Sequence, residues 1–66
     1  MKFYAVVFGN WHGISDEDVY EVFYNEDDAE RSCDYRNSTC DPDEWFEVRE
    51  WDEDKVKKFW GDYPIS

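Results

Sequence analysis

The side chains that dominate this sequence are carboxylates. Eighteen Asp and Glu residues stand against seven Lys and Arg residues in 66 positions, and the formal net charge is −11. The segment 16–34, DEDVYEVFYNEDDAERSCD, has nine acids and one base, Arg31, and the segment 41–54 has eight acids and one base, Arg49. These two segments therefore carry −8 and −7, and the other residues sum to +4.

Carboxylates at close spacing can hold a metal ion, act as an acid and base pair, or present negative charge to a partner. The runs 16–18 and 52–54 do not continue as an EF-hand loop, which needs Gly at its sixth position and Glu at its twelfth, and His12 is the only histidine. A glycosidase or nuclease uses one positioned carboxylate pair, but no pair stands out here, and so short a chain leaves little room for a pocket. We predict that the protein is not an enzyme and has no metal site and no cofactor.

The remaining use of these side chains is electrostatic. Duplex DNA carries one charge per ~1.7 Å of its axis, so the net charge corresponds to about 19 Å of duplex. That length is close to the diameter of a compact domain of this size, whose radius of gyration should be roughly 11 Å. The charge density is thus DNA-like. An acidic surface can also serve solubility alone, and for any single run of acids that interpretation stays open.

The composition predicts one folded domain over residues 1–66. Aromatic residues make up 21% of the chain, and each ring buries ~150–250 Å², which offsets the high charge. Residues 2–8 place apolar side chains on both faces, as in a central strand covered on both sides. Residues 9–18 are rich in turn formers and acids, which predicts a hairpin loop. We expect Trp11 and Ile14 to fold back on the sheet edge.

A second strand and a helix should follow. Residues 19–24 are mostly β-branched and aromatic, which favours a strand. Asn25 is a suitable N-cap for a helix that runs to about Arg36, where polar residues end it. The inner side of this helix should bury Ala29 and Cys33.

The last third of the chain predicts a strand and a short helix. Residues 41–43 form a turn around a proline, and residues 45–51 alternate as a third strand. Asp52 is expected to cap a helix with acids first and lysines last, in accord with the helix dipole. Gly61 should end that helix.

The element order ββαβα constrains the topology. A hairpin joins the first two strands, and a right-handed crossover through the first helix joins the second and third. With the doubly apolar strand in the middle, the prediction is an α+β fold. It has a three-stranded antiparallel sheet of order 2-1-3, one helix packed on the sheet and a short C-terminal helix.

This topology predicts two acidic poles roughly 20 Å apart, and we expect the 13 acids of these poles and four acids between them to bind the partner. The pole at the hairpin end comprises Asp16, Glu17, Asp18, Asp34, Asp41, Asp43 and Glu44. The pole at the opposite end comprises Glu26, Asp27, Asp28, Asp52, Glu53 and Asp54. Four further acids lie between the poles: Glu21, Glu30, Glu47 and Glu50.

The cysteines and the N-terminus bear on the compartment. Cys33 and Cys40 match no CxxC or zinc-ligand pattern, so they are either free thiols or, in an oxidising compartment only, a disulfide. The apolar stretch FYAVVF is too short for the core of a signal peptide or for a membrane helix. We therefore expect a soluble, cytoplasmic protein without membrane contact.

The pattern resembles a known class of protein. The acidic runs DEDVYE, NEDDAE and DPDEWFEVREWDED, in a ββαβ order that begins KFYAVVFG, make the whole chain similar to small acidic proteins that bacteriophages produce during host takeover. Several members of that class imitate DNA. The resemblance implies a phage origin and a bacterial host cytoplasm.

We predict that the chain, as a monomer or weak homodimer, binds the DNA-binding surface of a basic bacterial protein and does not itself bind nucleic acid. Carboxylates can copy phosphate positions but not the donor and acceptor pattern of base edges. The leading candidate is therefore a protein that recognises backbone and shape, the histone-like DNA-bending nucleoid protein. Two alternatives remain, an acidic module that binds a basic protein segment without competing with DNA, and a halophile-type solvated domain.

Overall fold

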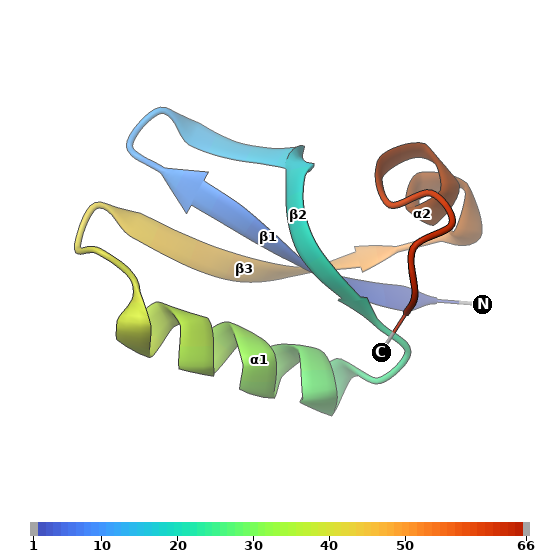
Figure 1. Ribbon diagram of the computed structural model, residues 1–66, viewed down its shortest axis with the longest axis horizontal. Coiled ribbons are helices and arrows are strands. Elements are labelled where there is room, and N and C mark those ends of the chain that lie inside the picture. Colours follow the sequence, from blue (N-terminus) through green and yellow to red (C-terminus); the bar gives the residue numbers. More distant parts are fainter. Residues whose placement is uncertain (1, 66) are drawn as a thin grey trace.

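The computed structural model describes residues 2–65 and is built from three strands and two helices (Figure 1). In chain order these are β1 (Phe3–Asn10), β2 (Gly13–Phe23), α1 (Glu26–Thr39), β3 (Glu44–Trp51) and α2 (Glu53–Phe59). The strands form one sheet of order β2-β1-β3, and both neighbouring pairs are antiparallel. The predicted α+β fold and its topology are confirmed.

Strand β1 separates two hydrophobic clusters. Ala5 and Val7 face one side of the sheet, where they pack with Trp51 and with Val56 of α2. Val6 faces the other side, in a cluster with buried side chains of α1. Each of these three β1 residues is fully buried, with no exposed area. The prediction of a central strand covered on both sides is therefore confirmed.

The hairpin between β1 and β2 is tighter than predicted. Only Trp11 and His12 form the turn, where Asn10 Oδ1 accepts a hydrogen bond from His12 N at 2.9 Å. Gly13 has a φ of +121°, which glycine adopts without a steric penalty. Residues 13–18 therefore belong to β2, and the prediction of a loop over residues 9–18 is wrong. Their acidic sequence is that of an outer strand with one edge in solvent.

Strand β2 is irregular in its middle. The register passes from Gly9 opposite Ile14 to Val7 opposite Val19, which leaves residues 15–18 facing little of β1. The strand bends there (Figure 1). Ile14 packs against the core as predicted.

Trp11 does not fold back on the sheet. Its side chain is 76% exposed at the hairpin tip, and its ring lies against His12 with the two centroids 3.6 Å apart. That part of the prediction is wrong, because a two-residue turn holds Trp11 beyond the end of the sheet.

Helix α1 begins and ends with side-chain hydrogen bonds to its own backbone. Asn25 Oδ1 accepts from Asp27 N at 2.8 Å, which confirms the predicted N-cap. The helix runs to Thr39, three residues beyond the predicted end. Ser38 Oγ donates to Tyr35 O at 2.7 Å. The polar residues expected to end the helix thus form its last turn, because their hydroxyls bond back to it.

Helix α2 has the predicted caps. Asp52 Oδ1 accepts from Lys55 N at 2.9 Å. Gly61 N donates to Val56 O at 2.9 Å, and Gly61 has a φ of +73°, which ends the helix in the left-handed conformation. No helix within residues 2–65 is long and apolar enough to cross a membrane.

A close contact between β1 and β3 gives a stability prediction. Trp45 lies opposite Gly9, and a Cβ added at Gly9 would stand 2.8 Å from Cε2 of that indole. Gly9→Ala should therefore lower the free energy of unfolding by roughly 1 kcal/mol, at the low end for overpacking. Urea unfolding followed by circular dichroism measures this. In a Trp45→Ala background the same change should be neutral or stabilising, because glycine is unfavourable within a strand. An equal loss in both backgrounds would contradict the contact.

Candidate partner-binding surface

All the carboxylates predicted to bind a partner lie at the surface. None of the buried residues within 2–65 is polar or charged. Five of the 17 predicted acids form ion pairs, namely Asp16 with Lys55, Glu21 with Arg36, Asp28 with Arg31, Glu47 with Arg49 and Glu50 with Lys2. The more exposed of these pairs, such as Asp28 with Arg31, add only ~0–1 kcal/mol each to stability. These ion pairs matter here because they neutralise charge locally. The other 17 − 5 = 12 predicted acids have no ion-pair partner among the described residues.

Seven of these 12 acids lie on α1, in the turn after it or at the start of β3, and we call them the α1 surface. They are Glu26, Asp27, Glu30, Asp34, Asp41, Asp43 and Glu44. The two bases of this helix, Arg31 and Arg36, are each paired with a carboxylate outside the set. Within the described part of the chain, the α1 surface is thus the largest group of acids that no base offsets.

The other five acids lie at the bend of β2 and the start of α2, and we call them the α2 surface. They are Glu17, Asp18, Asp52, Glu53 and Asp54. Lys57 and Lys58 stand in the last turn of α2, and neither forms an ion pair with a described carboxylate. The positive charges of these two residues offset part of the α2 surface. The two surfaces are therefore unequal, with the greater net negative charge beside α1.

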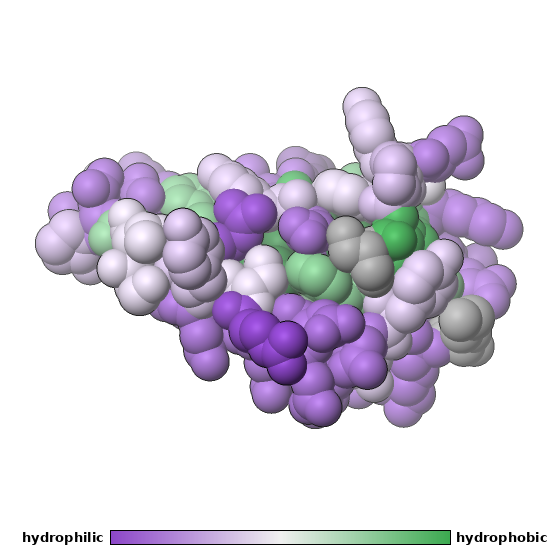
Figure 2. Space-filling view, turned by 60° about the horizontal axis from the view of Figure 1, so that its bottom comes forward, coloured by the Kyte–Doolittle hydropathy of each residue, from purple (hydrophilic) through white to green (hydrophobic). Residues whose placement is uncertain are grey.

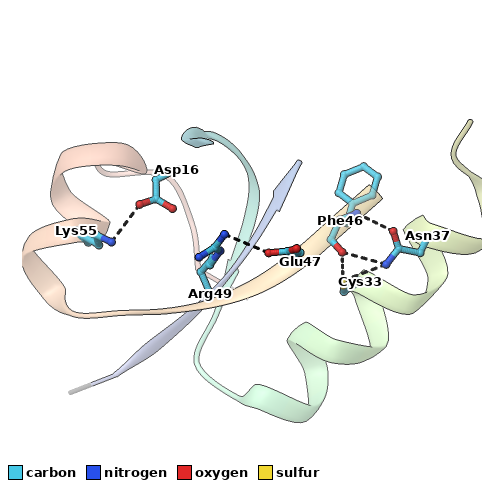
Figure 3. Close-up of polar contacts among 7 residues, drawn as sticks. All are labelled: Asp16, Cys33, Asn37, Phe46, Glu47, Arg49 and Lys55. Carbon is cyan, nitrogen blue, oxygen red and sulfur yellow. Dashed lines mark hydrogen bonds and ion pairs between the residues drawn. The ribbon is translucent and has the colours of Figure 1, made fainter. Parts of the chain in front are cut away.

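The predicted two poles are partly wrong. Asp41, Asp43 and Glu44 do lie at the hairpin end, since Glu44 lies opposite Asn10 in the register of β1 and β3. Asp16 does not, because the bend in β2 brings its Oδ2 within 3.1 Å of Lys55 Nζ on α2 (Figure 3). Glu17 and Asp18 follow it, so the run 16–18 belongs with α2 instead of the hairpin pole.

Asp34 is also displaced from its predicted place. It lines a groove between α1 and β3, of about 530 Å³, together with Glu30, Cys33, Glu47 and Val48. Glu30 and Asp34 are four residues apart and so share one flank of the helix. We call this hollow the α1–β3 groove. In Figure 2, a view from the side of α1, hydrophilic side chains cover most of the surface and apolar ones show between them.

Side chains of α1 hold the outer edge of β3. Phe46 N donates to Asn37 Oδ1 at 2.7 Å, and Asn37 Nδ2 donates back to Phe46 O at 3.1 Å (Figure 3). Cys33 Sγ donates to the same carbonyl at 3.1 Å, and Cys40 Sγ donates to Glu44 O at 3.2 Å. The amide of Asn37 thus occupies the place of a further strand. The only signal for this role in the sequence is the spacing of four residues from Cys33 to Asn37.

Both cysteines are free thiols. Burial raises the pKa of the Cys33 thiol, and the negative charge of Asp34 raises it further, while the hydrogen bond from Asn37 acts in the opposite direction. Glu47 and Glu30 add smaller increases in this pKa. The thiol at the floor of the groove therefore responds to the acids that line it.

Arg36 joins α1 to the opposite edge of the sheet. Its guanidinium carbon lies 5.3 Å from the ring centroid of Tyr20 and 5.8 Å from that of Phe46, and its Nη2 lies 3.8 Å from Glu21 Oε1. These contacts direct the positive charge of Arg36 toward β2 and the aromatic cluster, away from the α1–β3 groove.

Within residues 2–65, no three Asp, Glu, His or Cys side chains come close enough together to hold a metal ion. Comparisons with protein-family models, with curated proteins and with solved structures found no match to this chain. Any function must therefore be argued from the surface itself.

The thiol gives a prediction for the electrostatics of the groove. Asp34→Asn should speed the alkylation of Cys33 by iodoacetamide, because removing the negative charge lowers the thiol pKa and raises the thiolate fraction. The rate is measured by mass spectrometry in a Cys40→Ser background, from neutral to mildly alkaline pH. Asp28→Asn makes the same charge change outside the groove and is the control. Equal rates in the two variants would show that Asp34 does not act on Cys33.

Proposed function

We propose that this protein is a DNA-mimic inhibitor. It binds the DNA-binding surface of a basic bacterial protein, with the histone-like nucleoid protein as the leading candidate, and blocks access of that protein to DNA. The observation that carries the proposal is the α1 surface, a set of seven carboxylates that no base offsets within the described residues. In this proposal the protein is produced by a phage and acts in the cytoplasm of the bacterial host.

The dimensions of the molecule support the comparison with nucleic acid. Its longest extent is 33 Å, so a net charge of −11 corresponds to one charge per 33/11 = 3.0 Å. One strand of DNA carries a phosphate per ~3.4 Å of helix axis. The charge density is thus that of a single strand instead of the duplex inferred from the sequence, because the charge is spread over 33 Å and not over the about 19 Å of duplex that carries the same charge.

The kind of partner follows from what carboxylates can copy. Phosphate contacts fix the position of a protein on DNA, whereas sequence is recognised at base edges, which carboxylates do not reproduce. Architectural DNA-bending proteins rely on backbone contacts and insert apolar side chains between base steps. Tyr24, two residues before α1, and Tyr35, on α1, are 54% and 71% exposed, and they offer apolar surface to such side chains.

The test compares two triple variants that remove equal charge. The α1 variant is Glu26→Gln, Glu30→Gln and Asp34→Asn, and the α2 variant is Glu17→Gln, Glu53→Gln and Asp54→Asn. Each is titrated into labelled duplex DNA bound to the purified histone-like nucleoid protein, and the released DNA is followed by fluorescence anisotropy. The α1 variant should need on the order of tenfold more protein, since surface charges contribute ~0.2–1 kcal/mol each. The α2 variant should stay close to the parent.

Other outcomes would overturn this proposal. If the parent releases no DNA, the partner is wrong. If the parent binds the nucleoid protein while the DNA stays bound, the chain is an acidic interaction module and not a mimic. Equal losses in the two variants would contradict the assignment to the α1 surface. Circular dichroism of each variant shows whether it is folded.

The dependence of stability on salt separates the proposal from the halophile alternative. At neutral pH the repulsion among the carboxylates is screened as salt is added, so the midpoint temperature of unfolding should rise by a few degrees between low and physiological salt. For a domain of this size about 1 kcal/mol corresponds to 4–8 °C. The chain should nonetheless be folded at low salt, as calorimetry or circular dichroism would show. A chain that folds only in molar salt would be a halophile-type domain.

A further inference from the structure

The outer edge of β3 is closed over half of its length. Phe46 directs both its N–H and its C=O to Asn37, which is on the side away from β1. The pairing of β3 with β1 has a continuous register from Glu44 to Trp51. Because outward and inward groups alternate along a strand, Val48 and Glu50 direct their backbone groups to the same outer side as Phe46.

The other half of this edge is open. Among residues 2–65, no group outside the sheet is hydrogen bonded to the backbone of Val48 or Glu50. In contrast, Cys33 and Asn37 of α1 hold the carbonyl of Phe46, and Cys40, just after α1, holds that of Glu44. A free strand edge is a template on which another extended chain can pair. The open half thus presents backbone groups to which a further strand can hydrogen bond, next to a half where side chains already occupy those groups.

The α1–β3 groove lies beside this open stretch. Val48 is one of its lining residues, with Glu30 and Asp34 on the facing flank of α1. A strand laid against Val48 would direct every second side chain to the same face as the Val48 side chain, and hence into the groove. Neither Glu30 nor Asp34 has an ion-pair partner in the described chain. A cation that enters the groove would therefore meet two uncompensated carboxylates.

We propose that the open edge at Val48 and Glu50, together with the α1–β3 groove, binds an extended segment of a partner protein that carries Lys or Arg at alternate positions. The segment adds to the sheet as a fourth strand. Its backbone forms hydrogen bonds with β3, and its basic side chains lie against Glu30 and Asp34. The identity of the partner in this inference rests on the proposed function. The binding itself depends only on the open edge of β3 and the carboxylates of the α1–β3 groove.

A second copy of this chain is a poorer occupant of the same edge. It would bring a further net charge of −11 and would place the acids of two α1 surfaces near each other. Like charges brought together at an interface act against association. Charge complementarity thus favours a basic segment over self-association.

The test uses capped peptides as probes and the full chain as receptor. The first peptide alternates lysine and valine over seven residues, and the second has glutamate in place of lysine. The third is the lysine peptide with N-methyl groups on every second backbone amide. It is made in two versions, each with the amides of one edge methylated. Binding is measured by fluorescence anisotropy. The lysine peptide should bind and the glutamate peptide should not. N-methylation should weaken binding on the order of tenfold in one register, since each lost hydrogen bond is worth ~0.5–1.5 kcal/mol.

Matched variants of the chain locate the site. Glu30→Gln with Asp34→Asn should weaken the lysine peptide by roughly fivefold, whereas Glu17→Gln with Asp18→Asn, on β2 at the opposite edge of the sheet, should change it less than twofold. Val48→Pro removes an outward N–H and should also weaken binding, because the peptide loses a hydrogen-bond donor. The variant should fold, because proline is tolerated on an outer strand at a position whose N–H faces solvent. The N-methylated peptides test the edge on the unaltered chain if this variant does not fold.

Three results would overturn this inference. They are equal binding of the methylated and unmethylated peptides, equal effects of the two double variants, and a dimer in sedimentation that Val48→Pro dissociates. The third would make a second copy the occupant. The DNA-release assay of the proposed function is scored separately. If the parent releases DNA while the peptide tests fail, the α1 surface binds the nucleoid protein without strand addition. If the peptide tests succeed and no DNA is released, the groove binds a basic segment of another partner.

Discussion

The burial of β1 on both faces is the interaction on which the rest of this structure depends. A chain of 66 residues cannot form one thick core, and here the sheet is covered by α1 on one side and by α2 on the other. Ala5, Val6 and Val7 provide contacts to both layers because alternate side chains of a strand point to opposite faces. The fold is thereby stabilised by apolar and aromatic contacts, and every carboxylate is left at the surface.

The attachment of α1 to β3 couples the fold to the charged surface. Asn37 and Cys33 bind the backbone of Phe46, so the helix is held at the edge of the sheet as well as on its face. That position fixes the flank with Glu30 and Asp34 beside β3 and creates the α1–β3 groove. The same contacts close half of the β3 edge and leave the other half open, so charge and strand edge meet at one place.

The sequence was sufficient for the topology because the governing signal is local and repeated. Two apolar faces along residues 3–8 identify a central strand, and the caps at Asn25 and Asp52 define where each helix begins. The errors fall where a segment is shaped by its neighbours in space. Residues 13–18 form an outer strand whose polar side chains are indistinguishable from those of a loop.

The turn at Trp11 and His12 lacks the Asn-Gly type of signal that identifies a two-residue hairpin. The position of Asp16 beside Lys55 depends on the bend in β2, and the position of Asp34 depends on how α1 lies against β3. Neither relation is present in the local sequence. The division of the acids into an α1 surface and a partly compensated α2 surface therefore required the structure.

We propose that the carboxylates of this chain replace the phosphates of DNA, and the salt dependence of binding to the histone-like nucleoid protein measures this. The logarithm of the association constant is plotted against the logarithm of the salt concentration, for this chain and for duplex DNA with the same protein. We expect a linear and steep fall in both association constants, over about 50 to 200 mM salt, since charge contacts dominate each complex. An affinity for the chain that stays constant over this range would contradict it.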